Sequence, residues 1–210
     1  MPVLIPQNQN RATRERLCPF SRFRECGRAG FFVFALWLTL LGIGLNDARS
    51  QTISREYPLK AVFLLNFAQF TDWPTNAFDA PDSPFVIGVL GDDPFGDVLD
   101  EAVKDEQVAG RKFVVERYAR VEDVKNCHIL FISQSETRRM DKITNELKGK
   151  PILTVSDIDN LAYYHGVCVR FITENNKIRL RINTDSLKAA NLVMSSKLLR
   201  VAEVVPAPTK

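Results

Sequence analysis

Two adjacent carboxylates are the side chains whose place in the sequence points most directly to a binding site. Asp92 and Asp93 lie in the segment GDDPFG, after the apolar run FVIGVL and before a predicted helix. Ligands of open α/β sheets usually bind at the carboxyl ends of the strands, so both aspartates are weak candidates for ligand binding. Their charge argues against a nucleotide phosphate, and neither GxGxxG nor GxxxxGK[ST] occurs. The alternative is a turn in which Asp93 caps the helix.

Catalytic residue types do not form a recognisable set. A Ser-His-Asp hydrolase of the common α/β type would need a GxSxG motif, which is absent. The two histidines are His128, at the start of an apolar run, and His165, in a predicted turn; we interpret both as structural. A phospho-receiver domain would need an aspartate near Ser133. No His, Cys, Asp and Glu residues have metal-site spacing, so we predict no enzyme activity, no metal and no cofactor.

Cys127 and Cys168 are the two cysteines that follow residue 50. In an oxidising compartment they could form a disulfide if folding brings their Cα atoms within about 7 Å of each other. The other interpretation is two buried thiols. The sequence leaves both open.

The elements that would position these residues predict an α/β fold. Four short apolar or alternating runs predict strands, at residues 85–91, 112–118, 128–133 and 152–155. Segments with helical periodicity precede or separate them, at residues 56–70, 94–104 and 136–147. This alternation indicates a mostly parallel sheet in a three-layer α/β/α sandwich. Residues 167–183 predict a C-terminal antiparallel hairpin, and residues 186–204 a final amphipathic helix.

The first 50 residues have the pattern of an export signal. Six arginines precede an uncharged stretch at residues 29–46, and the small residues Ala48 and Ser50 follow it. We therefore predict a signal peptide at residues 1–50, one α/β domain at residues 51–205 and a flexible tail at residues 206–210. An uncleaved membrane anchor at residues 29–46 is the alternative. Both interpretations export the domain.

The charge of the chain is divided between these parts. Residues 1–50 hold seven arginines and three acidic residues, a net charge of +4, whereas residues 51–210 hold 21 basic and 22 acidic residues. The net charge of +3 therefore describes the export segment and not the domain. A near-neutral domain without a basic patch does not predict binding to nucleic acid.

Several ordered motifs cover residues 55–203. They read EYPLKAVFLLNFAQFTDWP, GDDPFG, CHILFIS, LTVSD and ANLVMSSKLLRVA. In content and order these motifs resemble the YfiR family of exported bacterial regulatory proteins. The family commonly carries four cysteines in two disulfides, whereas this domain has Cys127, which matches a family position, and Cys168.

The resemblance implies a non-enzymatic periplasmic regulator that tends to form a homodimer. It further implies binding to the periplasmic sensor portion of an inner-membrane signalling protein, with repression of a diguanylate cyclase and hence of cyclic-di-GMP signalling. An outer-membrane lipoprotein would be a second partner. The alternative function is a periplasmic small-molecule-binding module that serves a sensor kinase or a transport system.

A partner would be expected to contact two segments. Asn66 and Trp73 flank the first helix, and Glu174, Arg179 and Arg181 alternate along the predicted hairpin. We predict that these five residues are weak candidates for the partner interface. Ordinary solvated surface is the alternative for each of them.

Overall fold

The computed structural model describes residues 47–159 and 166–205, with side chains from Glu56 onward. The chain divides into two units, residues 1–48 and residues 49–210, and the second contains the sheet. Three predictions lie outside the described residues: the apolar stretch at residues 29–46, the turn at His165 and the tail at residues 206–210.

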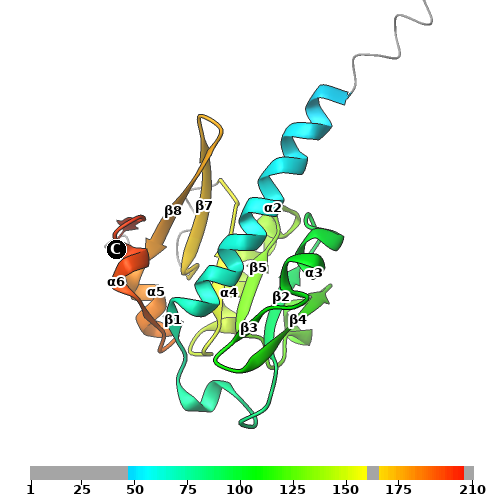
Figure 1. Cartoon of the computed structure of the whole chain (residues 1–210). Helices are drawn as coiled ribbons and strands as arrows, with labels where there is room; N and C mark the ends of the chain where they lie inside the picture. Colours follow the sequence, from blue (N-terminus) through cyan, green and yellow to red (C-terminus); the bar gives the residue numbers. More distant parts are fainter. Residues whose placement is uncertain (1–46, 160–165, 206–210) are drawn as a thin grey trace, which may run out of the picture. The chain divides into compact units, whose positions relative to one another are not determined.

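One eight-stranded sheet organises the second unit, with the strand order β10-β8-β7-β6-β5-β2-β4-β3. The strands are β2 (Phe85–Leu90), β3 (Gln107–Val108), β4 (Arg111–Tyr118), β5 (Ile129–Ile132), β6 (Leu153–Ser156), β7 (Val169–Glu174), β8 (Lys177–Asn183) and β10 (Glu203–Val205). Strands β4, β2, β5, β6 and β7 are parallel to their neighbours in this series, whereas β7 pairs with β8 in the antiparallel direction. The predicted mostly parallel sheet with a C-terminal antiparallel hairpin is confirmed. The hairpin extends beyond the rest of the sheet (Figure 1).

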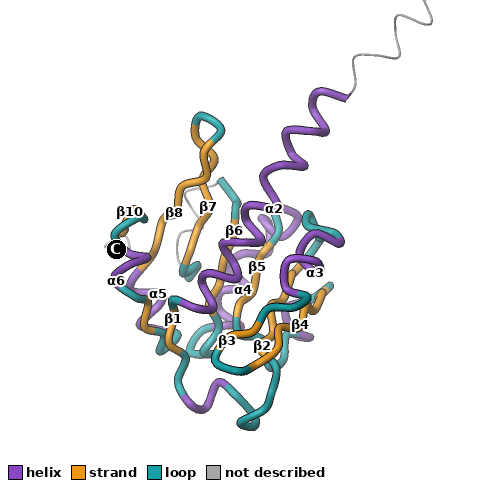
Figure 2. Tube along the Cα trace, in the orientation of Figure 1, coloured by secondary structure: helices purple, strands orange, loops and turns teal. Residues whose placement is uncertain are grey.

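Helices cover both faces of this sheet (Figure 2). Alternate residues of β5 belong to two separate hydrophobic clusters, Ile129 and Phe131 to one and Leu130 and Ile132 to the other. The helices of the first cluster are α2 (Asp47–Gln69), α3 (Asp97–Val103), α5 (Thr184–Ala189) and α6 (Ser196–Leu199). The second cluster contains α4 (Met140–Leu147), which follows the 3-10 helices η2 (Val121–Asp123) and η3 (Gln134–Arg139). The three-layer α/β/α sandwich is confirmed.

The first helix begins earlier than its sequence pattern predicts. Pro58 suits a first turn, but α2 runs from Asp47 and contains Pro58 in its interior. The ring of Pro58 has no N–H to donate, so α2 continues through this position with one intrahelical hydrogen bond fewer. The buried side of the helix after Pro58 contributes Leu64 and Phe67 to the first cluster.

The predicted final helix at residues 186–204 is wrong. The segment instead forms α5, the short strand β9 (Val193–Met194), α6 and β10. Asn191 ends the first helical part with a φ of +55°, in the left-handed region that a continuing helix cannot use. Strand β9 then pairs with β1 (Thr71–Asp72), and Ser195 N donates to Phe70 O. A long-range pairing therefore interrupts a segment whose local pattern is helical.

Candidate functional site

A buried ion pair joins α2 to the carboxyl end of β6. Lys60 Nζ lies 2.5 Å from Asp157 Oδ2, and the two side chains are 2% and 4% exposed. Glu56 Oε1 lies 2.7 Å from the same ammonium group, and Tyr57 OH donates to Asp157 Oδ2 at 3.2 Å. The ammonium also lies 4.5 Å from the centre of the Tyr57 ring, which is cation–π distance. One lysine and two carboxylates thus share a site with a net charge of −1.

The electrostatics of this site favour a structural role. Burial would raise the pKa of Glu56, but hydrogen bonds from Lys60 and Thr173 and the charge of Lys60 lower it overall. Burial, together with the charge of Asp157, raises the pKa of Tyr57 well above its usual value, so the phenol stays protonated. Lys60 is enclosed by these groups and lacks the exposure that a nucleophile or a general base needs to meet a substrate. The cluster is a clamp between α2, β6 and β7.

Lys60 and Asp157 were not among the candidates from the sequence. They lie 97 positions apart and belong to different motifs. Two signals were available: Lys60 is the one charged residue between Tyr57 and Thr71, and Asp157 directly follows the buried run of β6. An isolated charge on an otherwise apolar helix is expected to be exposed or paired, because burial of an unpaired charge costs several kcal/mol.

The position where this sheet would be expected to bind a ligand is closed. Connections leave β2 and β5 in opposite directions, which defines the switch point of a doubly wound sheet. Gly91 lies there with a φ of +90°, and a Cβ atom at this residue would lie 2.4 Å from Ser135 Oγ and 2.9 Å from Glu136 Oε1. Asp92 N donates to Ser135 Oγ at 2.9 Å. Side chains of η3, which follows β5, therefore fill the crevice.

The two candidate aspartates have different environments beside this crevice. Asp93 Oδ1 accepts from Phe95 N at 2.7 Å, and Asp93 Oδ2 accepts from Arg117 Nε at 2.7 Å. Asp93 thus holds the turn, but it does not cap α3, whose N-cap residue is Gly96. Asp92 is exposed. Because the carboxylate of Asp93 is already paired with Arg117, it is a weaker candidate for binding a ligand.

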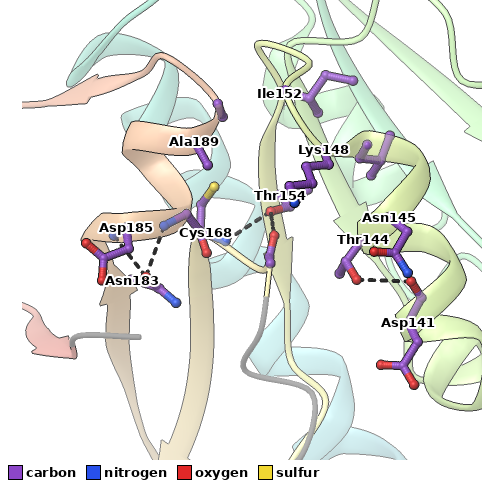
Figure 3. Close-up of a pocket in the computed structure, with 15 residues that line it drawn as sticks. Asp141, Thr144, Asn145, Lys148, Ile152, Thr154, Cys168, Asn183, Asp185 and Ala189 are labelled. Carbon is purple, nitrogen blue, oxygen red and sulfur yellow. Dashed lines mark hydrogen bonds between the residues drawn. The ribbon is translucent and has the colours of Figure 1, made fainter. Parts of the chain in front are cut away.

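A cavity of about 600 Å³ lies at the opposite, amino edge of β6 and β7. Figure 3 shows Thr144 and Asn145 of α4 on one side, Asp185 on the other, and Thr154 and Cys168 between them. The polar floor is hydrogen-bonded within the protein: Thr154 Oγ1 donates to Gly166 O at 3.1 Å, and Cys168 N donates to Thr154 Oγ1 at 2.9 Å. No sequence motif indicated this cavity, because its walls come from three separate segments.

The five candidate interface residues form two surfaces and not one. Phe171 and Leu180 of the hairpin belong to the cluster under α2, so the alternating residues Arg179 and Arg181 face the other side of the sheet. Arg179 is paired with Glu174 at 3.3 Å, and Arg181 with Glu203 at 2.6 Å. The remaining two candidates lie in and after α2. Asn66 is half-buried, and the ring of Trp73 packs edge-on against Phe85 with centroids 4.9 Å apart.

The outer face of α2 after Tyr57 is uncharged. Leu59 and Val62, one helical turn apart, are each 48% exposed. Asn66 and Gln69 continue the same face at the following turns. Because Lys60 points inward to Asp157, the helix presents no charge to solvent between Tyr57 and Thr71. We call the face formed by Leu59, Val62, Asn66 and Gln69 the α2 stripe.

Cys127 and Cys168 are free thiols. Both are buried, Cys127 in the cluster that contains α4 and Cys168 in the cluster that contains α2. Cys127 precedes β5 and Cys168 precedes β7, and β6 lies between these two strands. Two strand spacings are about 9–10 Å, which exceeds the separation of about 7 Å between Cα atoms that a disulfide allows. Burial raises the pKa of both thiols, so neither is a ready nucleophile.

His128 is part of an aromatic stack at the amino edge of β2 and β5. Its ring centroid lies 4.4 Å from that of Phe78 and 4.7 Å from that of Phe85, and Nδ1 accepts from Val86 N at 3.0 Å. Burial lowers the pKa of His128. These contacts agree with the structural interpretation of this histidine.

The described residues contain neither a metal-binding cluster nor a membrane-spanning helix. Within residues 47–159 and 166–205, no three His, Cys, Asp or Glu side chains are arranged to hold a metal ion. None of the helices in the same ranges combines the length and the apolarity needed to cross a membrane.

The sequence between the clamp and the C-terminal strand identifies the family. Residues 57–203 match the sequence pattern of the family described as YfiR/HmsC-like. The chain belongs to the YfiR/HmsC-like family. The match begins at Tyr57 in α2 and ends at Glu203 in β10, so it contains both partners of the Lys60–Asp157 pair. No curated protein matches the chain. Family membership is consistent with a periplasmic regulator of cyclic-di-GMP signalling.

Proposed function

We propose that this protein is a non-enzymatic periplasmic regulator that binds the sensor portion of an inner-membrane signalling protein and represses a diguanylate cyclase. Membership of the YfiR/HmsC-like family over residues 57–203 supports this function. The observation that carries the proposal is the α2 stripe, an uncharged helical face with two half-exposed aliphatic side chains.

The chemistry of the α2 stripe suits a protein partner. The buried centres of protein interfaces are depleted in charged residues, because a charge without a partner is costly to desolvate. Leu59 and Val62 would supply apolar contact area, and the amides of Asn66 and Gln69 would supply hydrogen bonds. The clamp to Asp157 supports the same surface, since it holds the ammonium group of Lys60 on the inner side of the helix.

The remaining polar clusters support a role without catalysis. Lys60 and Asp157 are paired in the interior, Asp93 is bonded to Arg117, and Ser135 and Glu136 fill the crevice beside Gly91. Catalysis requires an acid, base or nucleophile within hydrogen-bond reach of a substrate.

Substitutions in the α2 stripe test the proposal. Leu59→Glu and Val62→Glu place a carboxylate on the proposed contact surface, and we expect each to abolish co-purification with the membrane partner and to raise cellular cyclic-di-GMP. Val193→Glu is the matched control, because Val193 is 65% exposed on β9. The proposal fails if deletion of the gene leaves cyclic-di-GMP and sensor output unchanged, or if the stripe variants repress as the unaltered protein does.

Export is part of the proposal. The basic segment followed by the uncharged residues 29–46 supports a signal peptide, and the domain would then act in the periplasm. N-terminal sequencing of the protein from a periplasmic fraction should find a start near Gln51. Recovery of the intact chain in the inner-membrane fraction would instead support the anchored form.

An outer-membrane lipoprotein is the expected antagonist of this regulator. It should compete with the inner-membrane partner for the α2 stripe.

The cavity at the amino edge favours a second candidate function, a small-molecule-binding module that serves a sensor kinase or a transport system. A volume of about 600 Å³ lies within the range of ligand sites in proteins. A ligand that binds the folded state raises the melting temperature by mass action. We expect any such shift to disappear in Ala189→Trp, which would fill the cavity. The absence of a shift with a panel of periplasmic metabolites would contradict this function.

A further inference from the structure

The loop between β1 and β2 depends on one apolar side chain for its contact with the sheet. Residues 74–84 contain a single large apolar residue, Phe78, and their helical turn η1 (Thr75–Ala77) has no buried residue. The ring of Phe78 packs on His128 and, with centroids 6.3 Å apart, on Phe85. Figure 1 shows this loop beyond the end of the sheet where β2 begins. We call residues 74–84 the β1–β2 loop.

Arg111 of β4 ties the same loop to the sheet through its backbone. The guanidinium carbon lies 3.9 Å from the centroid of the Phe78 ring, and Nη1 donates to Ala80 O at 3.0 Å and to Ser83 O at 2.5 Å. One cation therefore already covers the ring of Phe78. The β1–β2 loop is thus held by Arg111 and by the aromatic contact with His128.

The hydrogen bond of His128 requires a neutral ring. Val86 N donates to Nδ1 at 3.0 Å, and Nδ1 of a protonated imidazole is a donor that cannot accept this bond. His128 is 2% exposed, so water does not reach the ring to replace the lost partner. Protonation would also bring a second positive charge to the ring that Arg111 covers. The closed position of the β1–β2 loop is therefore compatible with the neutral ring alone.

Two charged side chains act on this histidine. Burial is the largest influence and lowers the pKa of His128; Arg111 lowers it further, whereas Asp79 of the β1–β2 loop opposes them. Strands β2, β5 and β6, which lie beside the ring or continue from it, contain no charged residue. The surroundings as a whole therefore disfavour the protonated form.

We propose that the β1–β2 loop is an acid-released latch, which packs on the sheet while His128 is neutral and leaves it when the ring gains a proton. The rest of the sheet stays folded, because Phe78 is only partly buried and the loop adds no other side chain to the first cluster. In the open form the ring meets water and its pKa returns to about 6.5. The ratio of open to closed loop therefore rises as the pH falls below that value, by up to about tenfold per pH unit.

The latch would make the surface of the protein depend on pH. Release uncovers the rings of Phe78 and Phe85 at the amino edge of the sheet, so the chain presents different surfaces in neutral and in acid surroundings. An exported domain meets such changes, because water-filled porins connect the periplasm to the medium. This consequence rests on the proposed export, whereas the latch itself is a property of the chain.

Hydrogen exchange at one amide tests the latch. In NMR measurements on the full chain, corrected for the intrinsic exchange rate, the protection of the Val86 amide should fall about tenfold between pH 7.5 and pH 5.5. The amides of the buried strand β5 should keep their protection. The matched control is His128→Asn, whose side-chain oxygen can accept from Val86 N and does not titrate. In this variant the protection of Val86 should not change with pH.

Tryptophan emission gives an independent measurement. In a chain with Trp37 changed to Phe, Trp73 is the remaining tryptophan, and its ring packs edge-on against Phe85. Its emission should shift over the same pH range, while circular dichroism stays constant. Phe78→Ala removes the side chain that closes the latch and should give the acid-form emission already at pH 7.5. Thermal melts of each variant verify folding.

Three results would overturn the latch. The first is a Val86 amide whose protection is the same at pH 7.5 and pH 5.5. The second is an equal loss of protection in His128→Asn, which would assign the change to another group such as Asp79. The third is a simultaneous loss of protection throughout β5, because that is unfolding of the whole sheet. None of these results bears on the α2 stripe, so a failed latch and a failed regulatory function are distinguishable.

Discussion

Charged residues meet at two places in this molecule with opposite surroundings. At the carboxyl edge of the sheet, Lys60 and Asp157 are paired in the interior at 2% and 4% exposure. On the hairpin, Arg179 and Glu174 are paired at 66% and 48% exposure. Both pairs join a basic side chain to a carboxylate. Removal of one partner leaves a buried charge unpaired in the first pair, but only a hydrated charge in the second.

The difference in burial separates charged residues that stabilise the fold from charged residues that add little to its stability. Alternation along a strand makes hairpin charges conspicuous in a sequence, although most surface pairs contribute little to stability. The buried pair is inconspicuous because its members are far apart in the chain. We expect the free energy of unfolding to depend on the carboxyl edge far more than on the hairpin.

The largest effect is expected from Asp157→Ala. This substitution leaves the ammonium group of Lys60 buried with only Glu56 as a counter-charge, and should lower the free energy of unfolding by about 3–5 kcal/mol in urea denaturation. The control is Lys60→Met combined with Asp157→Leu, which removes both charges and should recover most of that loss. Equal losses in the single and double variants would show that the lost contacts are apolar and not ionic.

A smaller effect is expected from Gly91→Ala at the same edge. The added Cβ would lie 2.4 Å from Ser135 Oγ at a φ of +90°, and should cost about 2–4 kcal/mol in unfolding free energy. Gly149→Ala is the matched control, since its φ is +79°, close to that of Gly91, but nothing lies within 4 Å of the added atom. Its cost should be about 1–2 kcal/mol. Similar losses for both would mean that the crevice beside Gly91 is not closely packed.

Much of the fold could be predicted because its elements have local causes. The apolar run FVIGVL is β2, and the residues after it form a turn before a helix, as the pattern indicates. The segment after Ala190 could not be predicted in this way. Its helical periodicity is real, but a pairing with Thr71–Asp72 and the left-handed Asn191 outweigh it.

The candidate site was less predictable than the fold. Asp93 lies in the first strand-to-helix turn, but it does not cap the helix as the sequence suggested. Its partner Arg117 lies 24 positions away, and no sequence pattern connects the two. The cavity behind α4 depends on three segments at once. Sites of this kind follow from tertiary packing, which residue spacing does not encode.

His128, at the amino edge of β2 and β5, is a buried titratable side chain that folding favours in its neutral form. Burial keeps the folded-state pKa of His128 below its usual 6.5, despite the nearby carboxylate of Asp79 and in keeping with the charge of Arg111. The stability that comes from keeping His128 neutral is therefore complete above about pH 6.5. It is lost as the pH falls toward the folded-state pKa, by about 1.4 kcal/mol of unfolding free energy for each unit by which the folded and unfolded pKa values differ. The free energy of unfolding should fall between pH 7 and pH 5, and less so in His128→Asn. Parallel curves for the two proteins would contradict this.

The smallest effect is expected on the hairpin. Glu174→Gln removes one partner of an exposed pair, and should change the free energy of unfolding by no more than about 1 kcal/mol. Raising the salt concentration should reduce even this difference, because exposed charges are screened. A loss comparable to that of Asp157→Ala would remove the contrast between the two places.

The clamp between Lys60 and Asp157 also sets an order of events when the chain is made. The helix that carries Lys60 emerges early, but its counter-charge lies 97 residues later, beyond β2, β4, β5 and β6. Contacts so distant in sequence form late, because a long loop must close first. Until Asp157 emerges, the apolar side of α2 has no complete surface to pack on. The nascent chain is therefore most open to chaperones, proteases and aggregation during that interval.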